Sequence, residues 1–265
     1  MKDNSKGIAL VTGCSSGIGL TYAEKLAEQG YDLILVARSE NKLDVLAHRL
    51  RESTGRNVEV FATDLSDQQQ LNNLADKIKA TDNLTLLVNN AGLGDIKVFA
   101  QAQWQDLNKM LMVNVVALTQ LTHAALPNMI AQGGGTIINI SSGFAFGVMD
   151  MGVSVYGASK SYVAHFTEIL HEEVKDKNIT LQALIPGLTR TNLGGAEESG
   201  FFDKFPPELV MSTDDLVDAS FAGLKLGELI CIPRLDNYND WLEASEKMRA
   251  VGQSPNHNQA AGRYK

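Results

Sequence analysis

Tyr156 and Lys160 are the residues of this chain whose types and spacing point most directly to chemistry. They stand four positions apart, so a helix would place the phenol and the ammonium on one face. A free phenol has a pKa of about 10, and a fixed cation close to it favours the phenolate and lowers that pKa. The pair therefore predicts a tyrosine that exchanges a proton near neutral pH. A half-buried tyrosine above a solvated lysine is the alternative.

A glycine-rich turn near the N-terminus predicts a nucleotide site. It lies between an apolar strand candidate and a helical stretch, which is the setting of a dinucleotide-binding turn. Gly13 permits the tight turn, Gly17 lets the backbone approach a pyrophosphate, and Gly19 permits close packing of helix on strand. The predicted contacts are Gly13, Ser15, Ser16, Gly17, Ile18 and Gly19. A purely structural turn is the alternative.

The residue after the second strand candidate indicates which nucleotide binds. In NAD sites an acidic residue about 20 positions beyond the turn binds the ribose 2′-hydroxyl, but this chain has Arg38 there. A guanidinium matches a 2′-phosphate with a planar fork, and a bound phosphate relieves the poor placement of a cation at a helix N-terminus. Ser39 adds a hydroxyl, Glu40 opposes the assignment mildly, and a solvated Arg38 is the alternative. We therefore expect NADP(H) in preference to NAD(H).

Composition argues against several classes of protein. The chain of 265 residues has a formal net charge of −8 and no block of Lys or Arg, so we expect no nucleic-acid partner. Its two cysteines, Cys14 and Cys231, are too few for a disulfide framework, and no Cys and His cluster has metal spacing, so we expect no metal. The small number of cysteines fits a reducing cytosol, so we expect a cytoplasmic protein. We expect neither a signal peptide nor a membrane span.

The order of apolar and amphipathic stretches predicts an α/β fold. Apolar runs alternate with helical stretches such as Leu20 to Gln29 and Leu43 to Leu50, which is the pattern of a parallel sheet covered by helices on both faces. Ser66 is the predicted N-cap of a further helix. The strand candidates are Ile8 to Thr12, Leu33 to Ala37, Val58 to Ala62, Leu84 to Val88, Thr136 to Ile140, Thr180 to Ile185 and Leu229 to Ile232.

Two segments depart from this alternation of apolar strand candidates and helical stretches. Residues 188–212 combine glycines with Phe201, Phe202 and Phe205, and we interpret them as a mobile, apolar substrate loop. Residues 252–265 are polar and predict a tail that is disordered unless a partner holds it. We therefore expect one dinucleotide-binding and catalytic domain, residues 1–251, followed by this tail.

The motifs occur in an ordered series that resembles a known family. The series is the glycine turn, Asn89-Asn90-Ala91-Gly92, Asn114, Ser141-Ser142, Tyr156 to Lys160, and Pro186-Gly187. In this order, across residues 8 to about 192, the chain resembles the short-chain dehydrogenase/reductase family. The resemblance implies a single Rossmann-like, doubly wound domain with a seven-stranded parallel sheet. It also implies a homo-oligomer, commonly a tetramer built through two long helices, with a dimer as the alternative.

The resemblance further implies the residues of the site. The implied catalytic tetrad is Asn114, Ser142, Tyr156 and Lys160. Tyr156 would supply a proton, Ser142 would donate a hydrogen bond to the same substrate oxygen, Lys160 would hold the nicotinamide ribose, and Asn114 would complete a water-linked proton relay. Ser141 stays open as a substitute for Ser142. The implied cofactor contacts at strand ends, besides Tyr156 and Lys160, are Asp64, Leu65, Asn90, Ala91, Gly92, Pro186, Gly187, Thr189 and Thr191.

The predicted function is NADPH-dependent reduction of a ketone, aldehyde or 3-oxoacyl carbonyl to an alcohol, in a reversible reaction. Hydride transfer to the carbonyl carbon leaves charge on oxygen that must be stabilised and protonated. The side chains expected to line an apolar substrate pocket are Leu93, Phe144, Phe146, Met149, Met151 and those of Phe201 to Phe205. A non-catalytic NADP(H)-sensing interaction protein on the same fold is the alternative. A nucleotide-sugar epimerase is disfavoured by the short C-terminal region.

Overall fold

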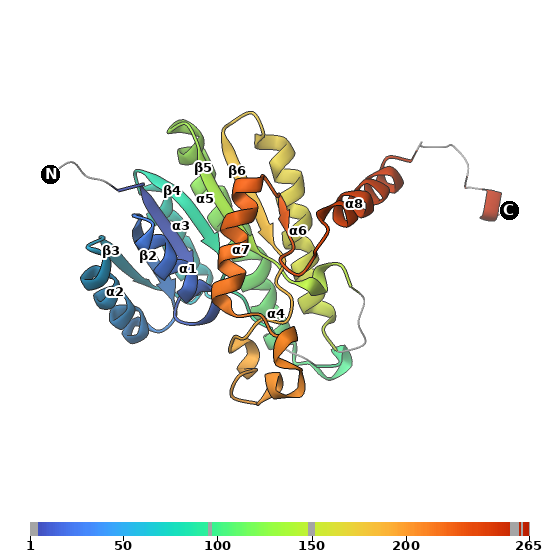
Figure 1. Ribbon diagram of the computed structural model, residues 1–265, viewed down its shortest axis with the longest axis horizontal. Helices are drawn as coiled ribbons and strands as arrows, with labels where there is room; N and C mark the ends of the chain where they lie inside the picture. Colours follow the sequence, from blue (N-terminus) through green and yellow to red (C-terminus); the bar gives the residue numbers. More distant parts are fainter. Residues whose placement is uncertain (1–4, 95–96, 148–151, 255–259, 261, 265) are drawn as a thin grey trace. The chain divides into compact units, whose positions relative to one another are not determined.

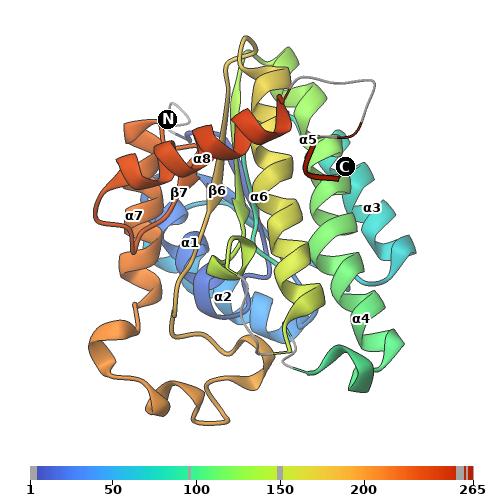
Figure 2. The same ribbon diagram turned by 90° about the vertical axis from the view of Figure 1, so that its right-hand side faces the viewer.

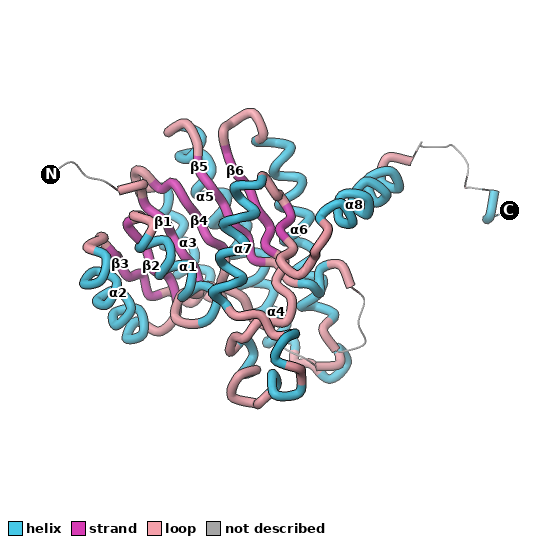
Figure 3. Tube along the Cα trace, viewed as in Figure 1, coloured by secondary structure: helices cyan, strands magenta, loops and turns pink. Residues whose placement is uncertain are grey.

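A parallel sheet of seven strands forms the centre of the protein in the computed structural model, which describes residues 5–94, 97–147, 152–254, 260 and 262–264. The strand order is β3-β2-β1-β4-β5-β6-β7, and every neighbouring pair is parallel (Figure 3). The strands are β1 (Ile8–Thr12), β2 (Asp32–Ala37), β3 (Val58–Ala62), β4 (Leu84–Asn89), β5 (Gly135–Ile140), β6 (Ile179–Leu184) and β7 (Ile230–Cys231). The α/β prediction is confirmed, with strand ends within two residues of those expected.

Helices cover both faces of this sheet. Helices α1, α2 and α7 pack on one face, and α3, α5 and α6 pack on the other (Figures 1 and 2). The longer helices of the main unit are α1 (Gly17–Glu28), α2 (Glu40–Thr54), α3 (Gln68–Lys79), α4 (Trp104–Leu111), α5 (Leu118–Ala131), α6 (Ser154–Val174) and α7 (Thr213–Leu226). The arrangement is the doubly wound one predicted from the sequence.

The core is divided into two layers by the alternation of side chains along the strands. In β2, Leu33 and Leu35 join the cluster under α1 and α2, whereas Ile34 and Val36 join the cluster under α3 and α5. Successive residues of a strand point to opposite faces, so a strand with helices on both sides needs an unbroken apolar run. This is why most of the strand candidates are β-branched or aliphatic throughout.

The topology fixes where a ligand binds. The connections run outward in one direction from β1 and in the other from β4, so the strand order reverses between these two neighbours. In an open α/β sheet a crevice forms at this point, outside the carboxyl ends of the strands. The glycine turn follows β1 and Asn89-Asn90-Ala91-Gly92 covers the end of β4. Both predicted motifs therefore meet at the crevice.

One long helical stretch runs from Trp104 to Ala131 through α4, the π-helical segment η2 (Met112–Ala117) and α5. By length and composition it is apolar enough to cross a membrane, with a mean hydropathy of 1.3, and half of the apolar window is buried inside the protein. A core helix passes the same test, and Leu121 and Ala125 of this stretch lie in the core cluster against the sheet. The predicted absence of a membrane span stays a prediction.

Two local expectations need correction. The N-cap of α3 is Asp67, whose carboxylate accepts a hydrogen bond from Gln70 N at 3.0 Å, and not Ser66, whose hydroxyl donates to Asp64 at 2.8 Å. Residues 188–212 are more regular than a plain loop. They contain the short 3-10 helices η4 (Leu193–Gly195), η5 (Phe201–Lys204) and η6 (Pro207–Leu209), and a bridge joins Thr189 to Met211.

The chain divides into two compact units, residues 1–233 and residues 234–265. The second unit contains α8 (Tyr238–Gly252), whose N-cap Asn237 accepts a hydrogen bond from Asn239 N at 3.2 Å, and the short η7 (Gly262–Tyr264). Helix capping by Asn satisfies an amide that has no partner within the helix. The expected boundary between residues 251 and 252 stays a prediction.

Candidate active site

The turn between β1 and α1 forms an open cradle. Gly13 and Gly17 have φ angles of 67° and 57°, in the left-handed region that favours glycine. A Cβ atom on Gly19 would lie 2.6 Å from the Gly13 carbonyl oxygen, so α1 packs this closely only without a side chain there. Ser16, the N-cap of α1, makes no side-chain capping bond, and the first turn contains no acidic residue. The unpaired amides of this helix end are therefore suited to an anion.

Hydrogen bonds join this turn to the end of β4. Asn90 Nδ2 donates to the carbonyl oxygens of Thr12 and Gly13 at 2.8 and 3.1 Å. Thr12 Oγ1 accepts from the backbone N–H groups of Asn90 and Ala91 at 2.9 and 3.0 Å. The side chain of the predicted contact Asn90 therefore holds the two edges of the crevice together.

Arg38 and Asp64 come together near the ends of β2 and β3. Asp64 Oδ1 accepts hydrogen bonds from the Ser66 backbone N–H and hydroxyl at 2.9 and 2.8 Å. Burial raises the pKa of the Asp64 carboxyl, but the Ser66 hydrogen bonds and the charges of Arg38 and Lys109 outweigh burial and hold the pKa below its ordinary value. An exposed guanidinium and an ionised carboxylate thus lie at the edge where a nucleotide ribose is expected.

Ser39 and Leu65, which follow Arg38 and Asp64 in the sequence, have side chains in different surroundings. Ser39 is the N-cap of α2 and makes no capping hydrogen bond with its hydroxyl. Leu65 is 6 % exposed and its side chain lies in the core cluster, so it stabilises the sheet face under α3. A ligand contact from Leu65 would have to come from its backbone.

Tyr156 and Lys160 lie in the first two turns of α6, with the Lys160 Nζ 5.8 Å from the centre of the Tyr156 ring. Lys160 is 4 % exposed, and its Nζ donates to the Ile140 carbonyl oxygen at 2.9 Å. Burial lowers the pKa of this ammonium to about 8. Burial raises the pKa of the Tyr156 phenol, and a hydrogen bond from Ser142 opposes that rise.

The expectation that Lys160 lowers the pKa of the Tyr156 phenol is therefore wrong. The loss of water around the Tyr156 phenol dominates, and the ammonium is engaged with Ile140 on the strand end. A phenol with a raised pKa carries its proton at neutral pH. The side chain is thus set up as a proton donor rather than as a phenolate.

The two serines after β5 have separate roles. Ser142 hydrogen-bonds the Tyr156 phenol, and its Oγ also accepts from Phe144 N at 3.4 Å. Ser141 Oγ instead donates to the Lys160 carbonyl oxygen at 2.7 Å, and this side chain is 2 % exposed. The geometry therefore places Ser142, the residue that the family pattern selects, beside the phenol.

Asn114 lies in the π-helical segment, and its side-chain amide bonds both the Leu93 backbone and the Ser159 hydroxyl. Its Oδ1 accepts from Leu93 N at 2.8 Å, and its Nδ2 donates to Leu93 O at 2.9 Å and to Ser159 Oγ at 3.0 Å. Between Asn114 and Lys160 lies Gly92, where an added Cβ would be 3.4 Å from Lys160 Nζ and 3.6 Å from Asn114 Oδ1. The absence of a side chain at Gly92 keeps this position open next to the ammonium.

The segment after β6 reaches both the glycine turn and the segment that follows Ser142. Pro186 O accepts from Gly143 N at 2.9 Å, and Thr189 Oγ1 donates to Gly187 O at 3.3 Å. The Thr191 methyl group lies 3.3 Å from the position of a Cβ on Gly17. These contacts place the predicted residues Pro186, Gly187, Thr189 and Thr191 along the crevice from the strand end to the turn.

Phe144, one of the apolar side chains predicted for the pocket, contacts Tyr156. The Phe144 ring contacts the Tyr156 ring edge-on, with centroids 5.9 Å apart. A Cβ on Gly94 would be 3.4 Å from Leu193 and 3.5 Å from Tyr156 Cε2, so Leu193 lies beside the phenol ring. Phe146 is 42 % exposed and Leu193 is 41 % exposed. The sequence analysis did not predict Leu193, because this residue is identified only by its contact with Gly94 in the folded protein.

Other predicted pocket residues pack elsewhere or lie outside the described part. Phe201 contacts Phe202 and Phe205 at centroid distances of 5.5 and 5.2 Å, and Arg190 covers the Phe202 ring at 5.4 Å. These phenylalanines therefore pack on one another within the loop. Met149 and Met151 lie outside the residues that the structure describes.

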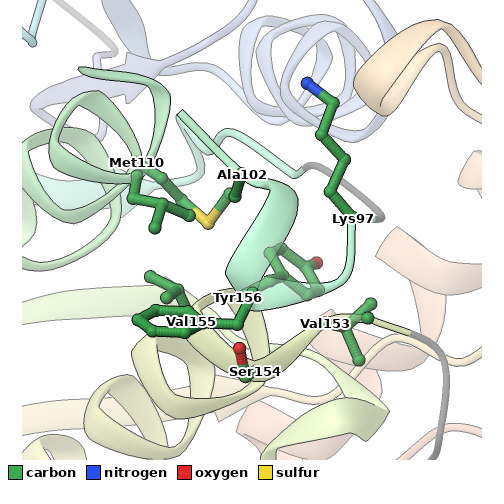
Figure 4. A pocket seen from close by; sticks show the side chains of 10 residues that line it. Lys97, Ala102, Met110, Val153, Ser154, Val155 and Tyr156 are labelled. Atoms are coloured by element: carbon green, nitrogen blue, oxygen red, sulfur yellow. The ribbon is translucent and has the colours of Figure 1, made fainter. Parts of the chain in front are cut away.

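A small cavity lies next to Tyr156. It is lined by Tyr156 and Val155 at the start of α6, by Leu107 and Met110 of α4, and by Phe99 among others (Figure 4). Its free volume of about 10 Å³ is close to what one water molecule needs. Among the predicted pocket residues that the structure describes, none lines this cavity. The sequence spacing of Leu107 and Met110 indicates only a buried helix face.

Residues 7–200 match a family model described as short chain dehydrogenase. The chain is 33 % identical over 207 residues to the very-long-chain 3-oxoacyl-CoA reductase of Macaca fascicularis, covering 76 % of this chain and 64 % of that protein. The chain therefore spans less than two thirds of the length of this relative.

Two solved structures match over nearly the whole chain. A bulky-bulky ketone specific alcohol dehydrogenase from Comamonas testosteroni is 34 % identical with a TM-score of 0.89, covering 98 % of this chain and 99 % of that one. A short-chain dehydrogenase from Sphingobium yanoikuyae in complex with NADPH is 35 % identical with a TM-score of 0.91, covering 97 % and 100 %.

Proposed function

The chain belongs to the short-chain dehydrogenase/reductase family, and we propose that it reduces an apolar ketone, aldehyde or 3-oxoacyl carbonyl with NADPH. The observation that carries the proposal is a half-buried Tyr156, whose phenol is hydrogen-bonded by Ser142, with Lys160 Nζ 5.8 Å from its ring centre. This set of groups can deliver a proton and a hydrogen bond to one oxygen atom.

Each of Tyr156, Ser142 and Lys160 has a separate role in the proposed reaction. A reduced nicotinamide, when bound, supplies the hydride. Tyr156 donates its phenol proton to the substrate oxygen, which its raised pKa permits because the phenol is protonated at neutral pH. Ser142 donates a hydrogen bond to the same oxygen and orients it. Lys160 is charged below about pH 8, and its ammonium next to Gly92 would hold the nicotinamide ribose through hydrogen bonds.

The residues present fit a dinucleotide. Gly13 and Gly17 have the positive φ angles that the turn needs, and Gly92 places no side chain beside the Lys160 ammonium. The uncapped N-terminus of α1 suits the pyrophosphate. The exposed Arg38 suits a 2′-phosphate, and its charge offsets the repulsion that the nearby Asp64 carboxylate would exert on that group.

The substrate class follows from the surroundings of the phenol. Phe144 contacts the Tyr156 ring, and Leu193 and Tyr156 both lie against Gly94, with Leu193 41 % exposed. A group buried there gains about 25 cal/mol for each Å² of apolar surface removed from water. The names of the similar proteins, a ketone-specific alcohol dehydrogenase and a 3-oxoacyl-CoA reductase, support carbonyl compounds with apolar substituents.

The test is a carbonyl panel with purified protein. NADPH oxidation is followed by absorbance with apolar ketones, aldehydes and 3-oxoacyl thioesters, and each assay is repeated with NADH. The proposal expects turnover with at least one apolar ketone or 3-oxoacyl compound, faster with NADPH. A protein that binds NADPH tightly but oxidises none of it across the panel would instead be the NADP(H) sensor. A homotetramer or dimer and a cytoplasmic location remain predictions, to be checked by light scattering and by fractionation.

A further inference from the structure

Ser159 is a buried serine whose hydroxyl joins the two walls of the site. One wall is helix α6, which carries Tyr156, and the other is the segment after β4, which carries Leu93. It is 2 % exposed, and its Oγ donates to the Tyr156 carbonyl oxygen at 2.7 Å. The same Oγ accepts from Asn114 Nδ2 at 3.0 Å. Asn114, itself 1 % exposed, holds both the N–H and the carbonyl of Leu93. One hydroxyl thus connects the helix that carries Tyr156 to the segment after β4.

We propose that Ser159 is a positioning residue that holds Tyr156 in register with the Leu93 backbone through Asn114. The inference rests on the proposed carbonyl reduction, because the Tyr156 phenol must meet a substrate oxygen whose place is set from the β4 side. The two hydrogen bonds of the Ser159 hydroxyl go to a backbone carbonyl and to the Asn114 amide, and neither goes to the phenol group.

Loss of the hydroxyl would be transmitted through the buried amide of Asn114. A serine hydroxyl has one proton and two lone pairs, and Ser159 uses the proton on Tyr156 O and one lone pair on Asn114. Without it, one N–H of the buried Asn114 amide is left unpaired, which costs more than the bond contributes when made. The amide can then tilt, and its two bonds to Leu93 weaken together. Misplacement of reacting groups by a fraction of an ångström lowers a reaction rate.

Ser161 provides a matched control on the same helix. Its Oγ donates to Ala145 O at 2.6 Å and to Gly157 O at 3.0 Å, so it also bonds backbone carbonyls of this region. Neither bond involves Asn114 or Leu93. Ser161→Ala therefore removes a similar hydroxyl without breaking the link between the two walls.

The first experiment needs no substrate or cofactor. Hydrogen exchange of the peptide containing Leu93 is measured by mass spectrometry in the wild type, Ser159→Ala and Ser161→Ala. We expect exchange at the Leu93 amide to be about five-fold faster in Ser159→Ala, the effect of losing roughly one net hydrogen bond, and unchanged in Ser161→Ala. Unchanged Leu93 exchange in Ser159→Ala, or equal acceleration in Ser161→Ala, would overturn the proposal. If Ser159→Ala does not fold, Ser159→Cys is used, since it keeps the volume but bonds weakly.

The second experiment measures NADPH-dependent reduction of acetophenone, or of the best ketone in the panel. Ser159→Ala should lower kcat about five-fold with little change in KM for the ketone, and Ser161→Ala should keep the wild-type rate. In a double-mutant cycle, Ser159→Ala should add little to the loss caused by Asn114→Ala, because both act through one link. Losses that multiply would contradict the proposal. If the wild type reduces no carbonyl, the proposed function fails, and the Leu93 exchange still decides the role of Ser159.

Discussion

Replacement of Lys160 by methionine should make the protein more stable. It should also remove the ammonium that we propose holds the nicotinamide ribose. The pKa of Lys160 falls from 10.5 to about 8 because the charged group is buried. At pH 7 this burial costs about 3 kcal/mol, from 1.36 kcal/mol for each pKa unit. The methionine side chain removes that cost but also removes the Lys160 bond to Ile140 O at 2.9 Å, which contributes about 1 kcal/mol. The net gain is about 2 kcal/mol.

The pH dependence of this gain has a defined sign. Between about pH 8 and 10.5 the unfolded wild-type chain holds the Lys160 proton and the folded chain does not, so wild-type stability rises with pH in that window. A methionine in place of Lys160 has no proton to exchange. The stability difference between Lys160→Met and the wild type should therefore be largest below about pH 8 and shrink toward pH 10.5.

Urea unfolding of the cofactor-free proteins, at pH 7 and again in the alkaline window, measures both quantities. At pH 7 the gain of about 2 kcal/mol corresponds to a Tm increase of roughly 4 to 8 °C for a chain of this size. The control is Lys177→Met, an exposed lysine, for which we expect a change within about 0.5 kcal/mol. A Lys160→Met variant that is no more stable than the wild type at pH 7, or whose advantage grows with pH, would refute the reasoning about burial.

Three further predictions concern the cofactor and the reaction. Arg38→Ala should weaken NADPH binding by about 10- to 100-fold, the loss of one charge-assisted hydrogen bond to a 2′-phosphate, and NADH binding far less; fluorescence titrations that show equal losses would remove this assignment. Gly13→Ala places a Cβ 2.8 Å from Ala91 Cα at a φ of 67°, so calorimetry should show destabilisation of about 1 to 3 kcal/mol, and an unchanged Tm would contradict it. The kcat/KM for NADPH in ketone reduction should fall as pH rises through about 8, because Lys160 loses its charge; a rate that climbs through this range would count against a charged Lys160.

The fold was predictable because its strands are short apolar runs with helical stretches between them. The expected Val58 to Ala62 strand matches β3 at both ends, and β7 is shorter than expected because only Ile230 and Cys231 pair with β6. Ser66 failed as an N-cap because Asp64 engages its hydroxyl, a contact between side chains that sequence spacing does not reveal. Local periodicity therefore fixes where elements lie better than it fixes their ends.

The candidate site was predictable as a set of residues but not as a set of contacts. The motif order brings Ser142, Tyr156 and Lys160 together as expected. The direction of the Tyr156 pKa was wrong because it depends on burial, which follows from the packing of Phe144 and its neighbours rather than from the four-residue spacing. Leu193 and Ser159 emerged only from distances across the fold.

The most direct test of the account is the turnover of Tyr156→Phe with NADPH and the best ketone of the panel. The variant keeps the ring that packs on Phe144 but loses the proton that the phenol donates. General acid catalysis contributes about 10²- to 10⁴-fold, so we predict a fall in kcat of at least about 100-fold while the Kd for NADPH changes by less than about three-fold. Turnover close to the wild-type rate, with NADPH still bound, would contradict the assignment of Tyr156 as the proton donor.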